Sequence, residues 1–483
     1  MENKNRITVT QLAIMTTVAV ASLRSLPAMA TAGWSSITQW LIPAIMFFVP
    51  TALVGAELGT KFKGGVFEWV KEAYGERLGF LAVWLQWIQN VVWYPTQLAM
   101  VAGTFAYFIG MDSLSNSGVY TGAVILIVYW GATFITLSGG NFFARVASTL
   151  GLIGTLIPAL LLFVMGGVWL MTGHPVSEIL THSDLLHEAN VVASGKVSGM
   201  TSPQWMLVVS NVLAFAGMEI NAIHVKNLDN PKSFSRVMVI TFVLVMGIFI
   251  LPTLVLSMTT PAAMTVTSAY QTTGVMVAFE NIFVTIFGPG AGIIANVIAL
   301  AVVLGATASI IAWLAGPSRG VADAGRTGLL PVMFQKENSK GVQSGILIPQ
   351  GIFVTALAAL YIIFKSSVSA VFLAITGFAA ALYVIMYIIM FFAAMKLRRE
   401  GKGLTEGYKA PALFFVSWLG IIGCTFGLVM SFVPVSNAAF PAVIYPFVVL
   451  GVIIVLGVWP LIFATVKKPE WNTQKGNETF TKE

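Results

Sequence analysis

Residues 19–27 read Ala-Val-Ala-Ser-Leu-Arg-Ser-Leu-Pro and occupy the middle of the first long apolar segment of the chain. Pro27 lacks a backbone N–H, and its ring clashes with the preceding helical turn. Ser22 and Ser25 offer hydrogen bonds in place of those that are lost, and Arg24 puts a permanent cation inside an apolar stretch. This stretch predicts a broken helix that lines a cavity. The alternative is a proline kink with an arginine that extends to a polar interface.

The composition of the chain defines the setting of this break. Of 483 residues, 57% are apolar and only 9% are charged, whereas soluble domains carry about 25% charged residues. So few charges cannot cover a globular surface, so the outer face must lie in hydrocarbon. A bilayer offers no partner for backbone amides, and the apolar segments are too long for barrel strands. The sequence therefore predicts a bundle of membrane-spanning helices.

Polar or Gly/Pro-rich breaks divide the chain into twelve apolar segments. The predicted spans cover residues 8–33, 38–58, 80–110, 119–137, 147–172, 203–223, 237–259, 282–315, 346–364, 368–395, 411–433 and 440–466. Cytoplasmic loops are enriched in Lys and Arg. Of the 26 basic residues, only Lys196 and Lys365 fall on the side opposite the N-terminus, and Arg24 falls within the first span. Both termini are therefore predicted to be cytoplasmic, in a multi-pass inner (cell) membrane protein.

A second polar interruption lies in the sixth segment, where residues 214–222 read Ala-Phe-Ala-Gly-Met-Glu-Ile-Asn-Ala. Gly217 permits unwinding, and Glu219 adds an ionisable group beside it. Interrupted spans at corresponding places in two halves indicate a transporter built from inverted repeats, with its site at the bilayer midplane. Glu219 holds a substrate amine, carries a proton, or pairs with a neighbour to lock the helix. These roles stay open.

The predicted fold is an all-α membrane protein with twelve transmembrane helices. A cytoplasmic N-terminus (1–7) precedes two five-helix repeats (8–172 and 203–395), helices 11 and 12 (411–466) and a cytoplasmic tail (467–483). Half-helix N-termini suit a carboxylate, and half-helix C-termini suit an ammonium group, so the two breaks together suit a zwitterionic amino acid. In the third span, one or two of the amides Gln86, Gln89, Asn90 and Gln97 are expected to line the path, while the rings pack.

Three stretches of the chain resemble a known family. Residues 64–70 read Gly-Gly-Val-Phe-Glu-Trp-Val; Gly217-Met218-Glu219 is followed by His224-Val225 and Asn230-Pro231; and residues 312–320 read Ala-Trp-Leu-Ala-Gly-Pro-Ser-Arg-Gly, followed by Leu329-Leu330-Pro331. Their order and spacing are similar to those of the amino acid–polyamine–organocation (APC) superfamily and, within it, of the glutamate:GABA antiporter family. The resemblance covers nearly the whole chain.

The resemblance implies a LeuT-like fold with two inverted five-helix repeats, interrupted helices 1 and 6, and two further C-terminal helices. It also implies that the substrate site includes Val20, Ala21 and Ser22 of the first helix and Phe215, Gly217 and Glu219 of the sixth. Two positions depart from the family pattern. Arg24-Ser25 stands where glutamate:GABA exchangers have an aromatic–acidic pair, and Ser309 stands where they have an acidic residue. We expect a substrate site with more positive charge than theirs.

The predicted function is secondary active transport by alternating access, in which spans 1, 2, 6 and 7 rock against spans 3, 4, 8 and 9. The expected reaction is exchange of an amino acid, glutamate or a neutral one such as tyrosine, for its decarboxylation product, GABA or an amine. The alternatives are proton-coupled uptake without obligatory exchange, agmatine/putrescine exchange (disfavoured by Arg24) and an amino acid sensor. Its partners are these small solutes and the lipid bilayer. No enzyme activity, cofactor, metal or nucleic acid is predicted.

Overall fold

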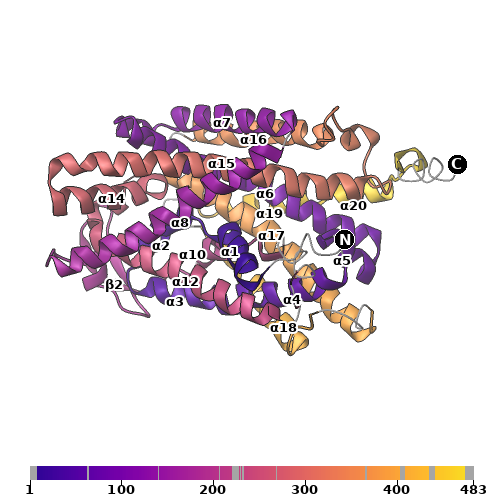
Figure 1. Cartoon of the computed structure of the whole chain (residues 1–483), viewed down its shortest axis with the longest axis horizontal. Coiled ribbons are helices and arrows are strands. Elements are labelled where there is room, and N and C mark those ends of the chain that lie inside the picture. Colours follow the sequence, from indigo (N-terminus) through magenta and orange to yellow (C-terminus); the bar gives the residue numbers. More distant parts are fainter. Residues whose placement is uncertain are drawn as a thin grey trace.

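The computed structural model shows a long bundle of helices (Figure 1). It describes residues 8–62, 65–139, 141–205, 207–219, 228, 230, 233–267, 269–364, 367–402, 408–434 and 441–473. Two ends of the bundle serve as reference points below. The hairpin end carries the strands β1 (Glu188–Val191) and β2 (Val197–Thr201), and the opposite end, called the α5 end, carries helix α5 (Gly65–Tyr74).

The predicted first and second spans are each made of several pieces. The first consists of α1 (Val9–Val20), the short 3-10 turn η1 (Leu23–Ser25) and α2 (Leu26–Ala30). The second consists of α3 (Ser35–Pro43), the π-helical turn η2 (Ala44–Phe48) and α4 (Val49–Lys61). Pro43 at the end of α3 cannot donate the regular i to i−4 hydrogen bond, and a π-bulge follows at that point.

The remaining spans are mostly continuous helices. Their bounds are α6 (Glu76–Phe108), α7 (Gly118–Ser138), α8 (Asn141–Met171), α10 (Leu207–Ala214), α12 (Phe234–Thr259), α15 (Gly292–Gly325), α16 (Ser344–Ile363), α17 (Val368–Arg399), α18 (Leu413–Ser431), α19 (Tyr445–Gly457) and α20 (Trp459–Thr465). Short connecting elements are η3 (Asp112–Asn116), α9 (Glu178–Thr181), α13 (Ala262–Thr265), η6 (Pro289–Ala291), η7 (Val332–Gln335) and η8 (Pro469–Trp471), and the 18-residue helix α14 (Tyr270–Phe287) lies between α13 and η6.

The predicted eighth span, residues 282–315, was placed wrongly. The structure assigns its first residues to α14, and α15 begins only at Gly292 and continues to Gly325. Gly288 has a φ of +90°, a conformation that L side chains rarely adopt, and Pro289 follows it. Both features end a helix. A long apolar run therefore holds two helices rather than one.

Nine helices among the described residues are long and apolar enough to cross a membrane by length and composition. The first, third and sixth predicted spans are absent from these nine. The first is broken, and the second part of the sixth lies outside the described residues. The third corresponds to α6, whose 33 residues reach about 50 Å at about 1.5 Å per residue but include many rings and amides. The count of twelve spans stays a prediction.

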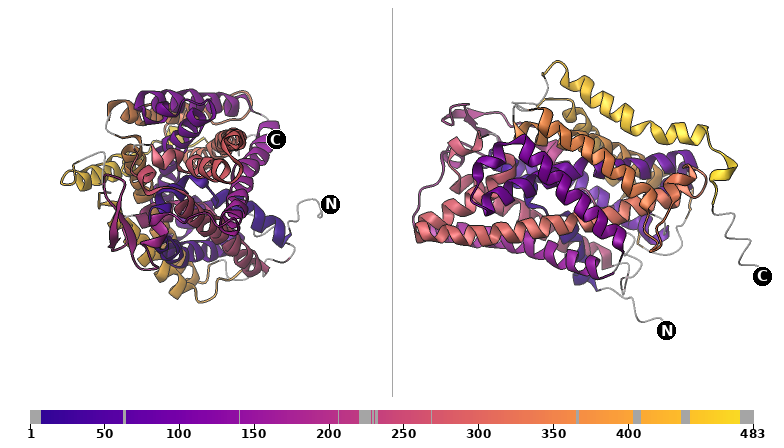
Figure 2. Two further views of the ribbon diagram at one scale, coloured as in Figure 1. Left: turned by 90° about the vertical axis from the view of Figure 1, so that its left-hand side faces the viewer. Right: turned by 90° about the horizontal axis from the view of Figure 1, so that it is seen from above.

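The helices pack in two groups with α17 in contact with both (Figures 1 and 2). In one group, α12 packs against α1, α2, α3 and α4, and α10 packs against α3. In the other, α6, α7, α15 and α16 pack against one another, and α8 packs along α15. Helix α17 contacts α4 and α10 of the first group and α6 of the second. Side chains on α17 can therefore reach both groups at once.

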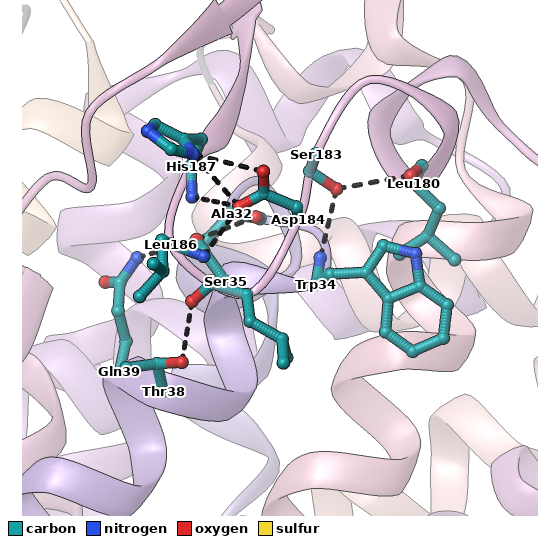
Figure 3. A network of polar contacts seen from close by, with 11 residues as sticks. Ala32, Trp34, Ser35, Thr38, Gln39, Leu180, Ser183, Asp184, Leu186 and His187 are labelled. Atoms are coloured by element: carbon teal, nitrogen blue, oxygen red, sulfur yellow. Dashed lines mark hydrogen bonds and ion pairs between the residues drawn. The ribbon is translucent and has the colours of Figure 1, made fainter.

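The segment between α8 and α10 closes the hairpin end, and it corrects the all-α prediction. Strands β1 and β2 pair antiparallel, with Glu188 opposite Thr201. Figure 3 shows the preceding loop against the start of α3: the Trp34 amide donates to Ser183 Oγ at 3.0 Å, and Thr38 Oγ1 donates to the Leu185 carbonyl at 2.7 Å. This loop is tied to the bundle through backbone groups that no residue pattern reveals.

Two carboxyl groups of this loop have opposite environments. Exposed Asp184 accepts hydrogen bonds from the Leu186 and His187 amides and contacts the His187 ring, and these contacts lower its pKa. Glu188 is buried, which raises its pKa, although its Oε1 accepts from Gln39 Nε2 at 2.7 Å and from the amide of Gln204. Desolvation outweighs these hydrogen bonds at Glu188.

At the α5 end, Glu57 joins α4 to α17. Its carboxylate accepts from Lys61 Nζ at 2.8 Å, from both Nε and Nη2 of Arg398, and from the amide of Ala410 at 2.8 Å. The side chain of Glu57 is only 4% exposed. A buried carboxylate with several charge-assisted donors is satisfied, whereas loss of one partner would leave a buried charge unpaired.

Candidate functional site

The first helix break lies at Ala21 and Ser22. Helix α1 ends at Val20, and the next two residues are extended, with ψ values of 128° and 138°. Ser22 Oγ accepts a hydrogen bond from the Arg24 amide at 3.3 Å, which starts η1. Pro27 occupies the first turn of α2, where no N–H is needed. The break therefore precedes the proline, which begins the second half of the helix rather than kinking the first.

Arg24 follows this break and is buried, with 2% of its surface exposed. Its Nη1 lies 3.2 Å from Thr376 Oγ1 and 3.4 Å from Thr96 Oγ1. The guanidinium carbon lies 5.5 Å from the centre of the Phe372 ring. Nε has no hydrogen-bond partner, and no carboxylate pairs with Arg24 among the described residues. A buried cation without an anion is costly, which makes Arg24 a candidate functional residue.

The second break lies at the end of α10. The helix stops at Ala214, and Gly217 has a φ of +105°. A Cβ at this glycine would lie 2.9 Å from Cη2 of Trp313 on α15. Both the backbone conformation and the close ring require glycine here. The turn thus brings the backbone of the sixth span against α15.

Glu219 lies just beyond this turn and is 2% exposed. Oε1 accepts hydrogen bonds from Gln86 Nε2 at 2.9 Å and from the Tyr383 hydroxyl, and Oε2 accepts from the Tyr387 hydroxyl at 2.5 Å. The Gly217 amide donates to the Tyr387 oxygen at 3.1 Å. One tyrosine therefore connects the unwound backbone to the buried acid, and the acid has no cationic partner among the described residues.

The same two helices hold both buried charges. On α17, Thr376 contacts Arg24, and Tyr383 and Tyr387 contact Glu219. Residues 7 and 11 positions apart lie on one face of a helix. On α6, Thr96 contacts Arg24 and Gln86 contacts Glu219. These contacts are ten residues apart on α6, which corresponds to about 15 Å along the helix. The cation and the acid thus lie at different depths along one polar line.

Rings occupy the interval between these two charges. Trp93 of α6 lies seven residues after Gln86 and hence on the same face, and its ring centre is 6.0 Å from that of Trp313. The Tyr94 hydroxyl donates to the Trp313 carbonyl at 3.1 Å and fixes α6 against α15. Ser309 is half-buried one turn before Trp313 and donates to the Ala306 carbonyl at 2.8 Å. Ser309 therefore lies on the α15 face that approaches Gly217.

Other predicted site residues are placed in packed surroundings. Phe215 is fully buried in an aromatic cluster, with its ring centre 5.6 Å from Trp40, 5.2 Å from Phe48 and 5.3 Å from Phe249. Val20 is buried at the end of α1. Ala21 is buried and Ser22 is half-buried, and both belong to the extended turn. The contacts of Phe215 are those of a core ring.

The structure gives contacts for several side chains of the third span, while the expectation that one or two of its amides line the path stays a prediction. Gln86 faces Glu219, whereas Trp84 donates to the Leu456 carbonyl and Trp87 donates to Gln350 Oε1. Sequence reasoning did not identify the partners Thr96, Thr376, Tyr383 and Tyr387. Their signal is weak, because it consists only of hydroxyl-bearing residues spaced by whole turns within apolar spans. Residues 63–64, 220–227 and 231, which carry parts of the first two family stretches, lie outside the described residues.

Long apolar helices around a buried charged centre define a polytopic membrane protein with a polar site inside its bundle. The family model described as amino acid permease matches residues 7–458. This chain therefore belongs to the amino acid permease family of the APC superfamily.

Similar proteins are also transporters by name. An uncharacterized transporter of Legionella pneumophila is 31% identical over 442 residues, which cover 90% of this chain and 91% of that protein. A glutamate/gamma-aminobutyrate antiporter of Lactococcus lactis is 26% identical over 445 residues, covering 90% and 86%. A probable agmatine/putrescine antiporter of the same species is 22% identical over 373 residues, covering 76% and 74%.

Proposed function

We propose that this protein is an amino acid antiporter of the inner membrane that exchanges an amino acid for its decarboxylation product by alternating access. The observation that carries this proposal is the pair of helix breaks, each followed by a buried ionisable residue, Arg24 or Glu219. Free backbone groups and buried charges at broken helices are the means by which such transporters bind zwitterions. Relatives named as antiporters support exchange.

The proposed architecture has twelve spans in two inverted five-helix repeats, with both termini cytoplasmic and the hairpin end outside. The grouping of α1, α3, α4, α10 and α12 against α6, α7, α15 and α16 supports it, because one group can rock against the other. By this assignment α14 is an outer helix between the seventh and eighth spans. The substrate site would include the turns at Ala21 and Ser22 and at Gly217, with Ser309 facing them from α15.

The test is exchange in proteoliposomes that contain the purified protein. Vesicles are loaded with glutamate, GABA, tyrosine, tyramine, agmatine or no solute, and uptake of each labelled external solute is measured. The proposal predicts that uptake requires an internal amino acid or its amine product. Uptake into empty vesicles driven by a proton gradient would instead establish proton-coupled uptake. Absence of transport with every pair would refute the proposed function.

A further inference from the structure

Arg24 differs from the other well-buried charged side chains of this bundle because part of its hydrogen-bonding capacity is unused. Glu57 accepts from four donor atoms of three residues, and Glu219 accepts from three side chains. Arg24 can donate five hydrogen bonds, yet among the described residues its hydrogen-bond partners are two threonine hydroxyls at 3.2 and 3.4 Å, and its Nε has no partner there. A side chain that is 2% exposed cannot take these bonds from bulk water.

The two hydroxyls around Arg24 are already oriented by their own helices. Thr376 Oγ1 donates to the Phe372 carbonyl at 2.8 Å, and Thr96 Oγ1 donates to the Trp93 carbonyl at 2.7 Å. Each hydroxyl therefore uses its single proton and presents a lone pair to the guanidinium. These neutral acceptors hold the group in place without neutralising it. The geometry leaves Nε and further N–H groups of the guanidinium for an anion.

The site of Arg24 lies toward the hairpin end. Thr376 lies eight residues after the start of α17, whereas Arg398, which pairs with Glu57 at the α5 end, lies near the last turn. Thr376 also lines a pocket together with Ser210 of α10, Gly377 and Ser431. Helix α10 begins at Leu207, shortly after β2. The pocket therefore adjoins the Arg24 site from the hairpin end.

The distance to Glu219 limits what a substrate can touch. Thr376 is separated from Tyr383 and Tyr387 by 7 and 11 residues, or about 10 to 17 Å along α17. One extended residue spans only about 3.5 Å of chain, which is well below this separation. A small solute at Arg24 therefore does not reach Glu219 at the same time. The two charges form separate positions along the path.

We infer that Arg24 binds a carboxylate of the transported solute at the hairpin side of the path. This inference rests on the proposed exchange function and specifies its substrate: a carboxylate-bearing amino acid is selected at this side over an analogue in which that carboxylate is neutral. A planar guanidinium suits this role because it can bind a carboxylate through two parallel hydrogen bonds. An inorganic anion such as chloride shares the same chemistry, and the experiment separates the two.

The test uses right-side-out membrane vesicles, preloaded with the counter-substrate, so that competitors meet the hairpin side. For whichever amino acid the wild-type protein transports, inhibition by unlabelled amino acid is compared with inhibition by its α-carboxamide; for glutamate, the γ-carboxamide glutamine is included. The expected preference for the acid is about tenfold to a hundredfold in the wild type. Arg24→Gln should reduce this ratio to about one. Arg24→Lys should leave an intermediate ratio, because lysine keeps the charge but lacks the planar guanidinium that binds both carboxylate oxygens.

The ratio of inhibition by the acid to inhibition by the carboxamide does not depend on how much protein is inserted, whereas the exchange rate does. An unchanged ratio in Arg24→Gln, or a wild-type ratio near one for every carboxamide, would overturn the inference while exchange itself still supports the proposed function. A purely structural arginine would lower exchange of all solutes equally. If chloride is the ligand, replacement of chloride by methanesulfonate, an anion without a carboxylate, abolishes wild-type exchange, and the inference is again overturned. If Arg24→Gln is not inserted, Thr376→Val keeps the charge and should lower the ratio several-fold.

Discussion

Replacement of Glu219 by Gln tests the buried acid network most directly. The substitution keeps the size of the side chain but converts one acceptor oxygen into an NH2 donor. That donor faces hydroxyls of Tyr383 and Tyr387 or the amide of Gln86, which now donate to the carboxylate. If the Tyr387 oxygen accepted from this NH2 group as well as from the Gly217 amide, its O–H would lose the carboxylate to which it now donates.

The expected size of the effect follows from these three hydrogen bonds. A hydrogen bond to a charged group contributes about 1.5–3 kcal/mol, and one between neutral groups contributes about 0.5–1.5 kcal/mol. Loss of the charge therefore weakens each bond by about 1 kcal/mol, or about 3 kcal/mol for the network. Since about 1.4 kcal/mol corresponds to a factor of ten, the arrangement around Gly217 loses about a hundredfold in relative population. We expect exchange to fall by about tenfold to a hundredfold.

The assay is counter-substrate exchange in proteoliposomes that contain equal amounts of inserted protein. The matched control is Glu178→Gln, which removes the same charge from an exposed position in the loop at the hairpin end and should leave exchange unchanged. Tyr387→Phe should also impair exchange, because it removes the acceptor of the Gly217 amide. Wild-type exchange rates in Glu219→Gln would refute the role of this network in transport.

Three further predictions concern stability. Gly217→Ala should lower both Tm in detergent and exchange, because its φ of +105° is strained and the new Cβ would lie 2.9 Å from the Trp313 ring; a Tm equal to that of the wild type would contradict this. Burial raises the pKa of Glu188 above its ordinary value of 4.5, so the folded protein binds a proton more readily than the unfolded chain, and stability should increase as pH falls from neutral toward that value. Glu188→Gln should remove this pH dependence of Tm. If Tm of the variant still changes with pH in the same way, another group is responsible. Glu57→Gln should lower Tm by several degrees, because it leaves Lys61 and Arg398 without their carboxylate; an unchanged Tm would show that this pair contributes little.

Much of the candidate site could be proposed from the sequence because the cost of polar groups in hydrocarbon is local. Arg24 and Glu219 stand out within apolar stretches, and Gly217 beside Glu219 marks a place where a helix can unwind. The exact break in the first span was less predictable. Residue chemistry pointed to Pro27, whereas the family resemblance pointed to Val20, Ala21 and Ser22, and the extended residues are indeed Ala21 and Ser22. A proline tolerates the first turn of a helix, so it marks a helix start as readily as a kink.

Phe215 shows what a family pattern leaves undetermined. Its position matches the unwound segment, yet the ring packs among Trp40, Phe48 and Phe249. Backbone position is inherited with the fold, but the direction of a side chain depends on which helices surround it. The loop at the hairpin end gives a similar case, since Glu188 is buried by contacts with α3 that its own polar neighbourhood does not suggest.

The sequence by itself determined that the chain lies in a membrane, that its first and sixth spans are interrupted near Arg24 and Gly217, and which charges those two breaks carry. These properties depend on neighbours within a few positions and on the low polarity of lipid. Only the tertiary structure decided what each charge meets. Arg24 meets Thr376, which is 352 residues away, and Glu219 meets Tyr383, which is 164 residues away. Such pairs form because packing aligns one face of α17 with both breaks, and no local pattern of residues specifies that alignment.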